Sequence, residues 1–137
     1  MANKILTFVD ASVLIYAATK PTSATFARRA RALQVLTDPD REFVATEYLQ
    51  LEVMPIAKYF GKTKEIVFYE TFFAAVQHWV DNAALVTPAY NLACQYGLGA
   101  MDALHVVAAT SMNAEFVSAE KPTKPIYRAY INTSSVY

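Results

Sequence analysis

The sequence contains a single cysteine, Cys94, among its 137 residues. One cysteine excludes a disulfide within the chain and is typical of proteins from a reducing compartment. Twelve Lys and Arg residues are balanced by twelve Asp and Glu residues, so the chain lacks the strong positive charge of many nucleic-acid-binding proteins. Tight nonspecific binding to nucleic acid is therefore not expected, whereas binding of RNA at one local site is compatible with this balance.

Long apolar runs are also missing. No stretch approaches the roughly 20 apolar residues that cross a membrane, and Asp10 interrupts the first apolar segment too early for a secretory signal. We therefore expect a cytoplasmic protein without a membrane contact. The sequence has no GxGxxG or P-loop motif either, so a nucleotide cofactor is not expected.

The residues that are present predict a folded α/β protein. Hydrophobic residues make up 55% of the chain and charged residues 18%, which is ample for a core, and the length predicts one domain over residues 1–137. Short apolar strands are predicted at 5–9, 42–46, 84–86 and 115–119, with helices between them. This alternation predicts three layers, α/β/α, with a central parallel sheet of four to five strands.

Caps and apolar periodicity predict where the helices lie. Ser12 is expected to cap the first helix and Thr46 the third. The helix at 25–36 is expected to bury Phe26, Ala30 and Leu33. The helix at 47–60 is expected to bury a stripe that consists of Leu49, Val53, Ile56 and Phe60. Further helices are predicted at 64–80, 89–96 and 100–112.

Four acidic residues stand at unusual places in this pattern. Asp10 directly follows the first strand, and Glu120 follows the last predicted strand. Ligands of open α/β sheets bind beyond the carboxyl ends of the strands, where both residues are expected. Asp102 lies in the first turn of its helix, and Glu52 lies at the edge of an apolar stripe. We expect the four carboxylates to meet at one edge of the sheet.

Carboxylates that meet in apolar surroundings repel one another and cost stability unless a cation lies among them. Because no cysteine or histidine cluster accompanies these four, the expected ion is Mg²⁺ or Mn²⁺ rather than zinc. Such ions bind phosphate oxygens and activate water, and two of them form the usual clamp for phosphodiester cleavage. The pattern therefore predicts hydrolysis of a phosphodiester.

Each acid also has a simpler interpretation when it is taken alone. Asp10 is then a turn or cap residue, Asp102 an anion at a helix N-terminus, and Glu120 a loop acid beside Lys121. Only the joint pattern favours a metal site. His105 is interpreted more simply as a core histidine with satisfied hydrogen bonds than as a catalytic group.

Four segments of the chain resemble the four acidic motifs of the PIN-domain ribonucleases, in the same order and with similar spacing. They are FVDASVLIYA, EYLQLEVMP, YGLGAMDALHVVAA and FVSAEKP. The third is the most specific, and it resembles the small VapC-type toxins of toxin-antitoxin pairs. The resemblance implies a Mg²⁺-dependent endoribonuclease, for which Mn²⁺ can substitute, with four acidic residues that bind metal and catalyse: Asp10, Glu52, Asp102 and Glu120.

The resemblance also implies roles for other residues and partners. Ser12 and Ser118 correspond to hydroxyl positions beside the metal and its water. The partners implied are an RNA substrate, a second copy of the chain in a homodimer, and a small antitoxin. Three basic residues flank the proposed site and are candidates for RNA-phosphate contacts, namely Lys121, Lys124 and Arg128.

Two positions depart from the family pattern, because Ala11 replaces a common Thr and Glu120 is one methylene longer than the usual Asp. The second departure leaves open whether a second metal binds. The alternative to a nuclease is a PIN-like module that binds metal and RNA or a protein without turnover. Another phosphate-transfer fold is less compatible, since a dehalogenase-like phosphatase needs an acid where Ser12 stands and a receiver domain needs an acidic pair.

Overall fold

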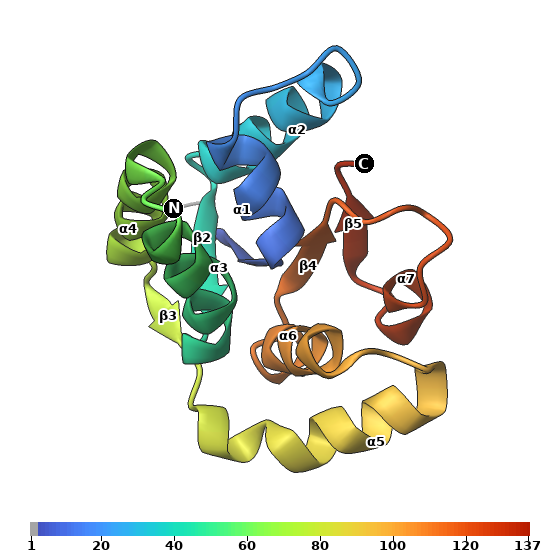
Figure 1. Cartoon of the computed structure of the whole chain (residues 1–137). Coiled ribbons are helices and arrows are strands. Elements are labelled where there is room, and N and C mark those ends of the chain that lie inside the picture. The colour runs from blue at the N-terminus through green and yellow to red at the C-terminus, as the bar shows by residue number, and fades with distance from the viewer. Residues whose placement is uncertain (1–2) are drawn as a thin grey trace.

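A computed structural model describes residues 3–137 and shows a five-stranded sheet between two groups of helices (Figure 1). Every neighbouring pair of strands is parallel, and the strand order is β3-β2-β1-β4-β5. The bounds are β1 (Ile5–Val9), β2 (Arg41–Ala45), β3 (His78–Trp79), β4 (Glu115–Ser118) and β5 (Thr133–Ser135). The predicted parallel sheet and its three-layer architecture are confirmed.

Helices fill every connection between the strands. In chain order they are α1 (Ala11–Ala18), α2 (Phe26–Leu36), α3 (Glu47–Tyr59), α4 (Thr63–Ala75), the 3-10 turn η1 (Asn82–Ala84), α5 (Val86–Tyr96), α6 (Ala100–Ser111) and α7 (Ile126–Ala129). Because crossovers between parallel strands are right-handed, α1 to α4 cover one face of the sheet and α5 to α7 cover the other (Figure 1). Within residues 3–137, no helix has both the length and the apolar character that a membrane crossing requires.

The chain builds the sheet outward from β1 in two directions. From β1 the chain moves outward to β2 and β3, then returns to β4 on the other side of β1 and moves outward to β5. Connections from β1 and β4 therefore leave toward opposite faces, which makes the carboxyl ends of these two strands the topological switch point of the sheet. Asp10 directly follows β1, and Glu120 lies two residues after β4.

The helical faces that meet the core differ in part from those predicted. In α3, Leu49 and Val53 are buried as expected, but Ile56 is 65% exposed and Phe60 is 64% exposed. The third buried residue of α3 is Ala57, which continues the spacing of four residues from Leu49 and Val53. The face predicted for the helix at 25–36 is also wrong, because Phe26 is 66% exposed and the buried residue of α2 is Ala32.

The predicted strand at 84–86 is wrong as well. Those residues belong to η1 and the start of α5, while the third strand is the two-residue segment His78–Trp79. His78 and Trp79 pair with Val44 and Ala45 at the edge of the sheet. This segment was expected to be the end of the helix at 64–80, which instead ends at Ala75. A two-residue edge strand is too short to produce a recognisable alternation.

An ionic cluster ties the strands together near the amino ends of β2 and β4. The Arg41 guanidinium donates to Thr7 Oγ1 at 2.8 Å and to the carboxylates of Glu115 and Asp38. Only 15% of the Arg41 side chain and 18% of the Glu115 side chain are exposed. Ser134 Oγ donates to the second oxygen of Glu115. The cluster therefore joins β1, β2, β4 and β5, at a distance from the switch point.

We expect an Arg41→Met variant to lose stability, because Glu115 and Thr7 are left largely desolvated without their donor. The expected cost is about 2 kcal/mol, less than for a fully buried pair because the cluster keeps some contact with water. Urea unfolding of the variant measures this cost. The double variant Arg41→Met with Glu115→Leu removes both charges and should recover part of the loss; an equally large or larger loss in the double variant would contradict this explanation.

Candidate functional site

Asp10 is held at the end of β1 by the strand and the helix that it joins. It is 3% exposed, and its backbone N–H donates to the carbonyl of Val117 at 3.1 Å, one residue beyond the β1–β4 pairing. Its carboxylate accepts from the backbone N–H of Val13 at 3.3 Å and so caps α1. The predicted cap, Ser12, is wrong, because the strand leads into the helix without a loop and Asp10 takes the cap position.

Two serine hydroxyls fix the Asp10 carboxylate. Ser12 Oγ donates to Oδ1, and Ser118 Oγ donates to Oδ2 at 2.6 Å. Each hydroxyl also accepts a backbone N–H at 3.0 Å, Ser12 from Ala119 and Ser118 from Glu120. Burial raises the pKa of Asp10 to about 6, against the opposing effects of the two hydroxyl bonds and of the charge of His105. The structure therefore places both predicted serines directly beside Asp10.

Three further acids lie within range of one another's charge. Asp102 is half-buried in the first turn of α6, as expected. Burial raises the pKa of Asp102, and the negative charges of Glu120 and Glu52 raise it further. The charges of His105 and Lys124 act in the opposite direction. The carboxylates from α3, from α6 and from the segment after β4 therefore meet in one region.

A tyrosine connects this region to Asp10. The hydroxyl of Tyr127 donates to the carbonyl of Glu120 at 2.6 Å. Burial raises the pKa of Tyr127, and the charges of Asp10 and Glu120 add to that effect. Asp10 and Glu120 thus both lie near the same hydroxyl. Sequence reasoning missed Tyr127, because it lies in the short segment after Pro125 and belongs to no motif.

Glu52 is bound by a histidine that was expected to belong only to the core. Glu52 Oε1 lies 2.6 Å from Nε2 of His105. The side chain of Glu52 is 35% exposed, which agrees with its predicted place at the edge of the apolar stripe of α3. His105 is buried as expected, but its Nδ1 has no hydrogen-bond partner. The interpretation of His105 as a fully satisfied core residue is therefore wrong. Its position three residues after Asp102, on the same side of α6, was the available signal.

The donor set fits a hard divalent cation. Within residues 3–137, no three Asp, Glu, His or Cys side chains lie close enough to form a complete ligand group. Mg²⁺ does not need such a group, because it usually keeps several waters and binds through one or two carboxylates. Burial is the main reason why the pKa of Asp102 is raised, and a bound cation would favour the ionised form that burial disfavours. Oxygen donors with excess negative charge suit Mg²⁺ or Mn²⁺ better than zinc.

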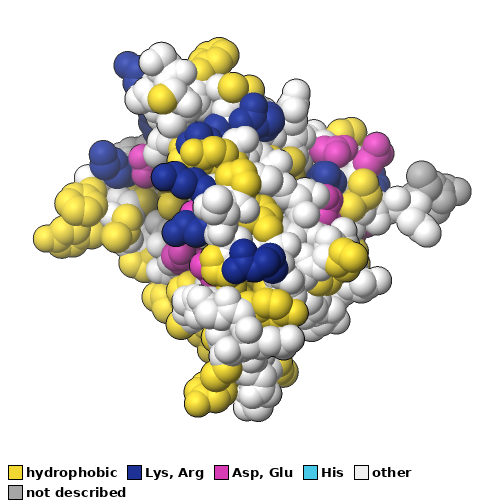
Figure 2. All heavy atoms as spheres, turned by 90° about the vertical axis from the view of Figure 1, so that its right-hand side faces the viewer, with side chains coloured by type: hydrophobic (Ala, Val, Ile, Leu, Met, Phe, Trp, Pro, Cys, Tyr) yellow, Lys and Arg dark blue, Asp and Glu magenta, His cyan; other side chains and the backbone are white. Residues whose placement is uncertain are grey.

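Basic residues follow Glu120 in the chain, and Lys124 is the one whose charge acts on Asp102. Lys121, Lys124 and Arg128 are exposed, and Lys124 is near enough to Asp102 to act on its pKa. Figure 2 shows the side of the molecule on which α7 lies, with Lys and Arg side chains beside acidic ones. The positive charge is thus local rather than a property of the whole chain, which has no net charge.

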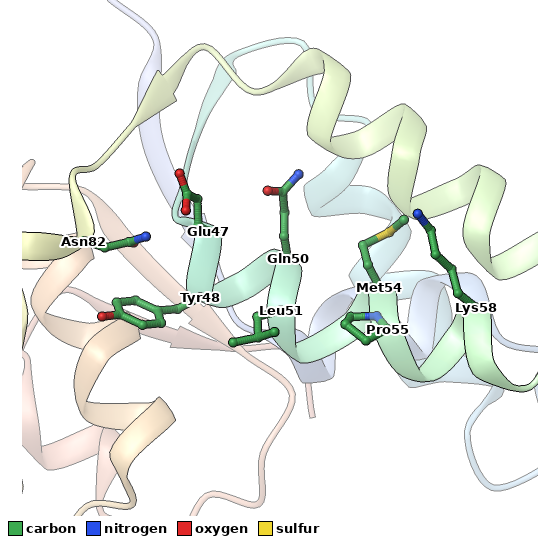
Figure 3. Close-up of a pocket in the computed structure, with 8 residues that line it drawn as sticks. All are labelled: Glu47, Tyr48, Gln50, Leu51, Met54, Pro55, Lys58 and Asn82. Carbon is green, nitrogen blue, oxygen red and sulfur yellow. The ribbon is translucent and has the colours of Figure 1, made fainter.

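A hollow of about 560 Å³ lies on another part of the surface, along one side of α3 (Figure 3). Glu47, Gln50 and Met54 of α3 line it together with Asn82 and other residues. None of the four acids lines this hollow. Its size therefore does not identify the site, which is defined by the chemistry of the carboxylates at the switch point.

Comparisons with known proteins agree with this architecture. The family model of the PIN domain matches residues 7–124, a range that includes all four acids. A comparison with curated proteins finds no match.

Solved structures share the fold at low sequence identity. A toxin-antitoxin complex from Klebsiella pneumoniae matches with a TM-score of 0.72 and 14% identity over 96% of this chain and 98% of that chain. VapBC2 from Rickettsia felis, bound to a DNA fragment from its promoter, matches with a TM-score of 0.66 and 16% identity. The match covers 96% of this chain and 98% of that chain. PAE2754 from Pyrobaculum aerophilum matches with a TM-score of 0.66 and 13% identity, over 96% of this chain and 90% of that chain.

Proposed function

The chain belongs to the PIN domain family, and from this premise we propose that it is a Mg²⁺-dependent endoribonuclease, the toxin of a toxin-antitoxin pair, built as one domain. The observation that carries the proposal is the meeting of carboxylates from α3, α6 and the segment after β4 beside the buried Asp10. The charges of Glu120 and Glu52 act on the half-buried Asp102, where burial already disfavours the ionised carboxylate. A divalent ion held by these carboxylates would stabilise their ionised forms.

In this proposal Asp10, Glu52 and Asp102 would hold the ion, and Glu120 would occupy the fourth acidic position. When bound, the ion polarises the phosphoryl oxygens and lowers the pKa of a water molecule. Ser12 and Ser118 keep the Asp10 carboxylate in one orientation by donating to its two oxygens. Such preorganisation matters because a ligand that is already in place does not have to be reordered when the ion binds.

The basic residues at the border would position the RNA. Contacts to backbone phosphates fix the register of a nucleic acid without reading its sequence. Lys121, Lys124 and Arg128 are exposed, and the charge of Lys124 acts on Asp102. All three would bind phosphates on either side of the bond to be cut. The repulsion between RNA and the carboxylates is thereby offset only at this site, in a molecule without net charge.

We also propose a small antitoxin and a second copy of the chain as partners, in the cytoplasm. Two of the similar structures are toxin-antitoxin complexes, which supports the first. Exposed apolar side chains on α3 and just after it support a protein contact, because large apolar patches are unusual on isolated monomers; they are Leu51, Ile56, Tyr59 and Phe60.

Cleavage assays with a mixture of structured RNAs test the activity. We expect the purified protein to cut RNA when Mg²⁺ or Mn²⁺ is present and to stop when EDTA removes the ion. Because water rather than the ribose 2′-hydroxyl is the nucleophile, the products should carry no 2′,3′-cyclic phosphate. Calorimetric binding of Mg²⁺ and RNA without any cleavage would contradict this function and favour the non-catalytic binding module.

A further inference from the structure

We propose that His105 is a positioning residue that holds the Glu52 carboxylate in the orientation required by the metal. The inference rests on the proposed function and assigns a role to a residue outside the four acids. The contact that carries it is the 2.6 Å hydrogen bond between His105 Nε2 and Glu52 Oε1. An ionised carboxylate only accepts hydrogen bonds, so Nε2 is the donor.

The histidine is the fixed member of this pair and the glutamate is the mobile one. The side chain of His105 is 1% exposed, whereas that of Glu52 is 35% exposed. Among the described residues, Glu52 has no other side-chain hydrogen bond. Glutamate has three rotatable side-chain bonds and loses considerable entropy when it is held in one rotamer. Without His105, nothing among these contacts would keep the Glu52 carboxylate at the site.

The ring of His105 in α6 contacts both α3 and β1. His105 lies three residues after Asp102 on α6, so the helix that presents Asp102 also presents the donor to Glu52 of α3. On its other side the ring packs against Phe8 of β1, with the ring centroids 5.3 Å apart. Phe8 lies two residues before Asp10. The histidine therefore sets the spacing between α3 and α6 at the place where Glu52 and Asp102 approach each other.

Packing alone does not account for a histidine at this position. Its Nδ1 is buried and has no hydrogen-bond partner. A buried polar atom without a partner costs stability, and most buried polar groups in folded proteins are paired. An apolar side chain of similar size would avoid this cost. What an apolar side chain would not supply is the donor to Glu52.

Metal affinity measured on the metal-free protein tests the proposal. The variants are His105→Leu, which removes the donor, His105→Gln, which can keep a donor near the Nε2 position, and His105→Asn, which is too short to reach Glu52. Calorimetric titration with Mn²⁺ gives the affinity, and thermal unfolding in EDTA gives the stability. We expect the Leu and Asn variants to lose about tenfold or more in Mn²⁺ affinity, as is typical when a group that orients a ligand is removed.

The Gln variant should keep most of the affinity, and the Leu variant should be at least as stable as the parent in EDTA. Equal Mn²⁺ affinity in the parent and the Leu variant overturns the inference, as does a Gln variant that loses as much as the Leu variant. If the Leu variant does not fold, the comparison of Gln with Asn decides alone. A parent protein that binds no Mn²⁺ overturns the proposed function itself, and the positioning role with it.

A double-mutant cycle shows whether His105 acts through Glu52. In a Glu52→Gln background, His105→Leu should cause little further loss of Mn²⁺ affinity. An undiminished loss in that background would show that the histidine acts on another group and would overturn the assignment to Glu52.

Discussion

An Asp102→Asn variant is expected to cleave RNA about a thousandfold more slowly than the parent or not at all, because the charge stabilisation that a bound metal ion supplies is worth several kcal/mol. Asp102 is the acid on which the charges of Glu120 and Glu52 act directly. Asparagine keeps the shape of the side chain and one oxygen but removes the negative charge that attracts the ion. Initial cleavage rates at saturating Mg²⁺ measure the effect.

The fold is expected to survive this substitution. Burial and the two neighbouring carboxylates raise the pKa of Asp102, so its ionised form is destabilised in the metal-free protein. Asparagine relieves that repulsion and gives up only the favourable place of an anion in the first turn of α6. A matched control is Glu65→Gln, another half-buried acid in the first turn of a helix, α4. The control should cleave at the parental rate; an Asp102→Asn variant that does the same would exclude Asp102 from the metal site.

An Asp10→Asn variant is expected to be more stable than the parent above pH 7 and inactive. Burial raises the pKa of Asp10 from 3.8 to about 6 in the folded protein. The folded state therefore holds a proton that the unfolded chain releases, so this contribution to stability is complete below about pH 4 and is lost as the pH rises through 6. Two pKa units correspond to about 3 kcal/mol. Asparagine does not ionise, so the variant avoids this loss.

Urea unfolding in EDTA at pH 4 and pH 8 measures the difference between the two proteins. The parent and the variant should be of similar stability at pH 4 and should differ by up to about 3 kcal/mol at pH 8. Asp81→Asn is the matched control, because Asp81 also caps a helical turn by accepting from a backbone N–H but is exposed. A pH 8 difference no larger than that of the control would mean that Asp10 ionises in the folded protein as readily as in the unfolded chain.

These two aspartates were also the easiest residues of the candidate site to predict, because their signals are local. Asp10 interrupts an apolar segment at a strand end, and Asp102 stands one turn into a helix that follows Gly99. The buried strands β1, β2 and β4 were predicted for the same reason, since each is a short apolar run with a clear end. Local composition is sufficient where one segment carries the whole pattern.

The parts that could not be predicted depend on contacts between distant segments. The bond between His105 and Glu52 joins residues 53 positions apart, and it exists only because α3 meets α6. The edge strands β3 and β5 are two and three residues long and are defined by their partners rather than by their own sequence. Ile56 and Ala57 both continue a helical spacing from Leu49 and Val53, yet Ile56 is exposed and Ala57 is buried. Periodicity alone does not show which side of the helix faces the sheet.

The hydrogen bond between Ser118 and Asp10 affects when a newly made chain can become functional. These residues are 108 positions apart, so the buried aspartate gains its second hydroxyl only after most of the chain has been translated. Glu120 becomes available still later. A chain that is still growing on the ribosome therefore lacks a complete carboxylate set, and the proposed cleavage of RNA would begin only once the newly made protein has folded from end to end.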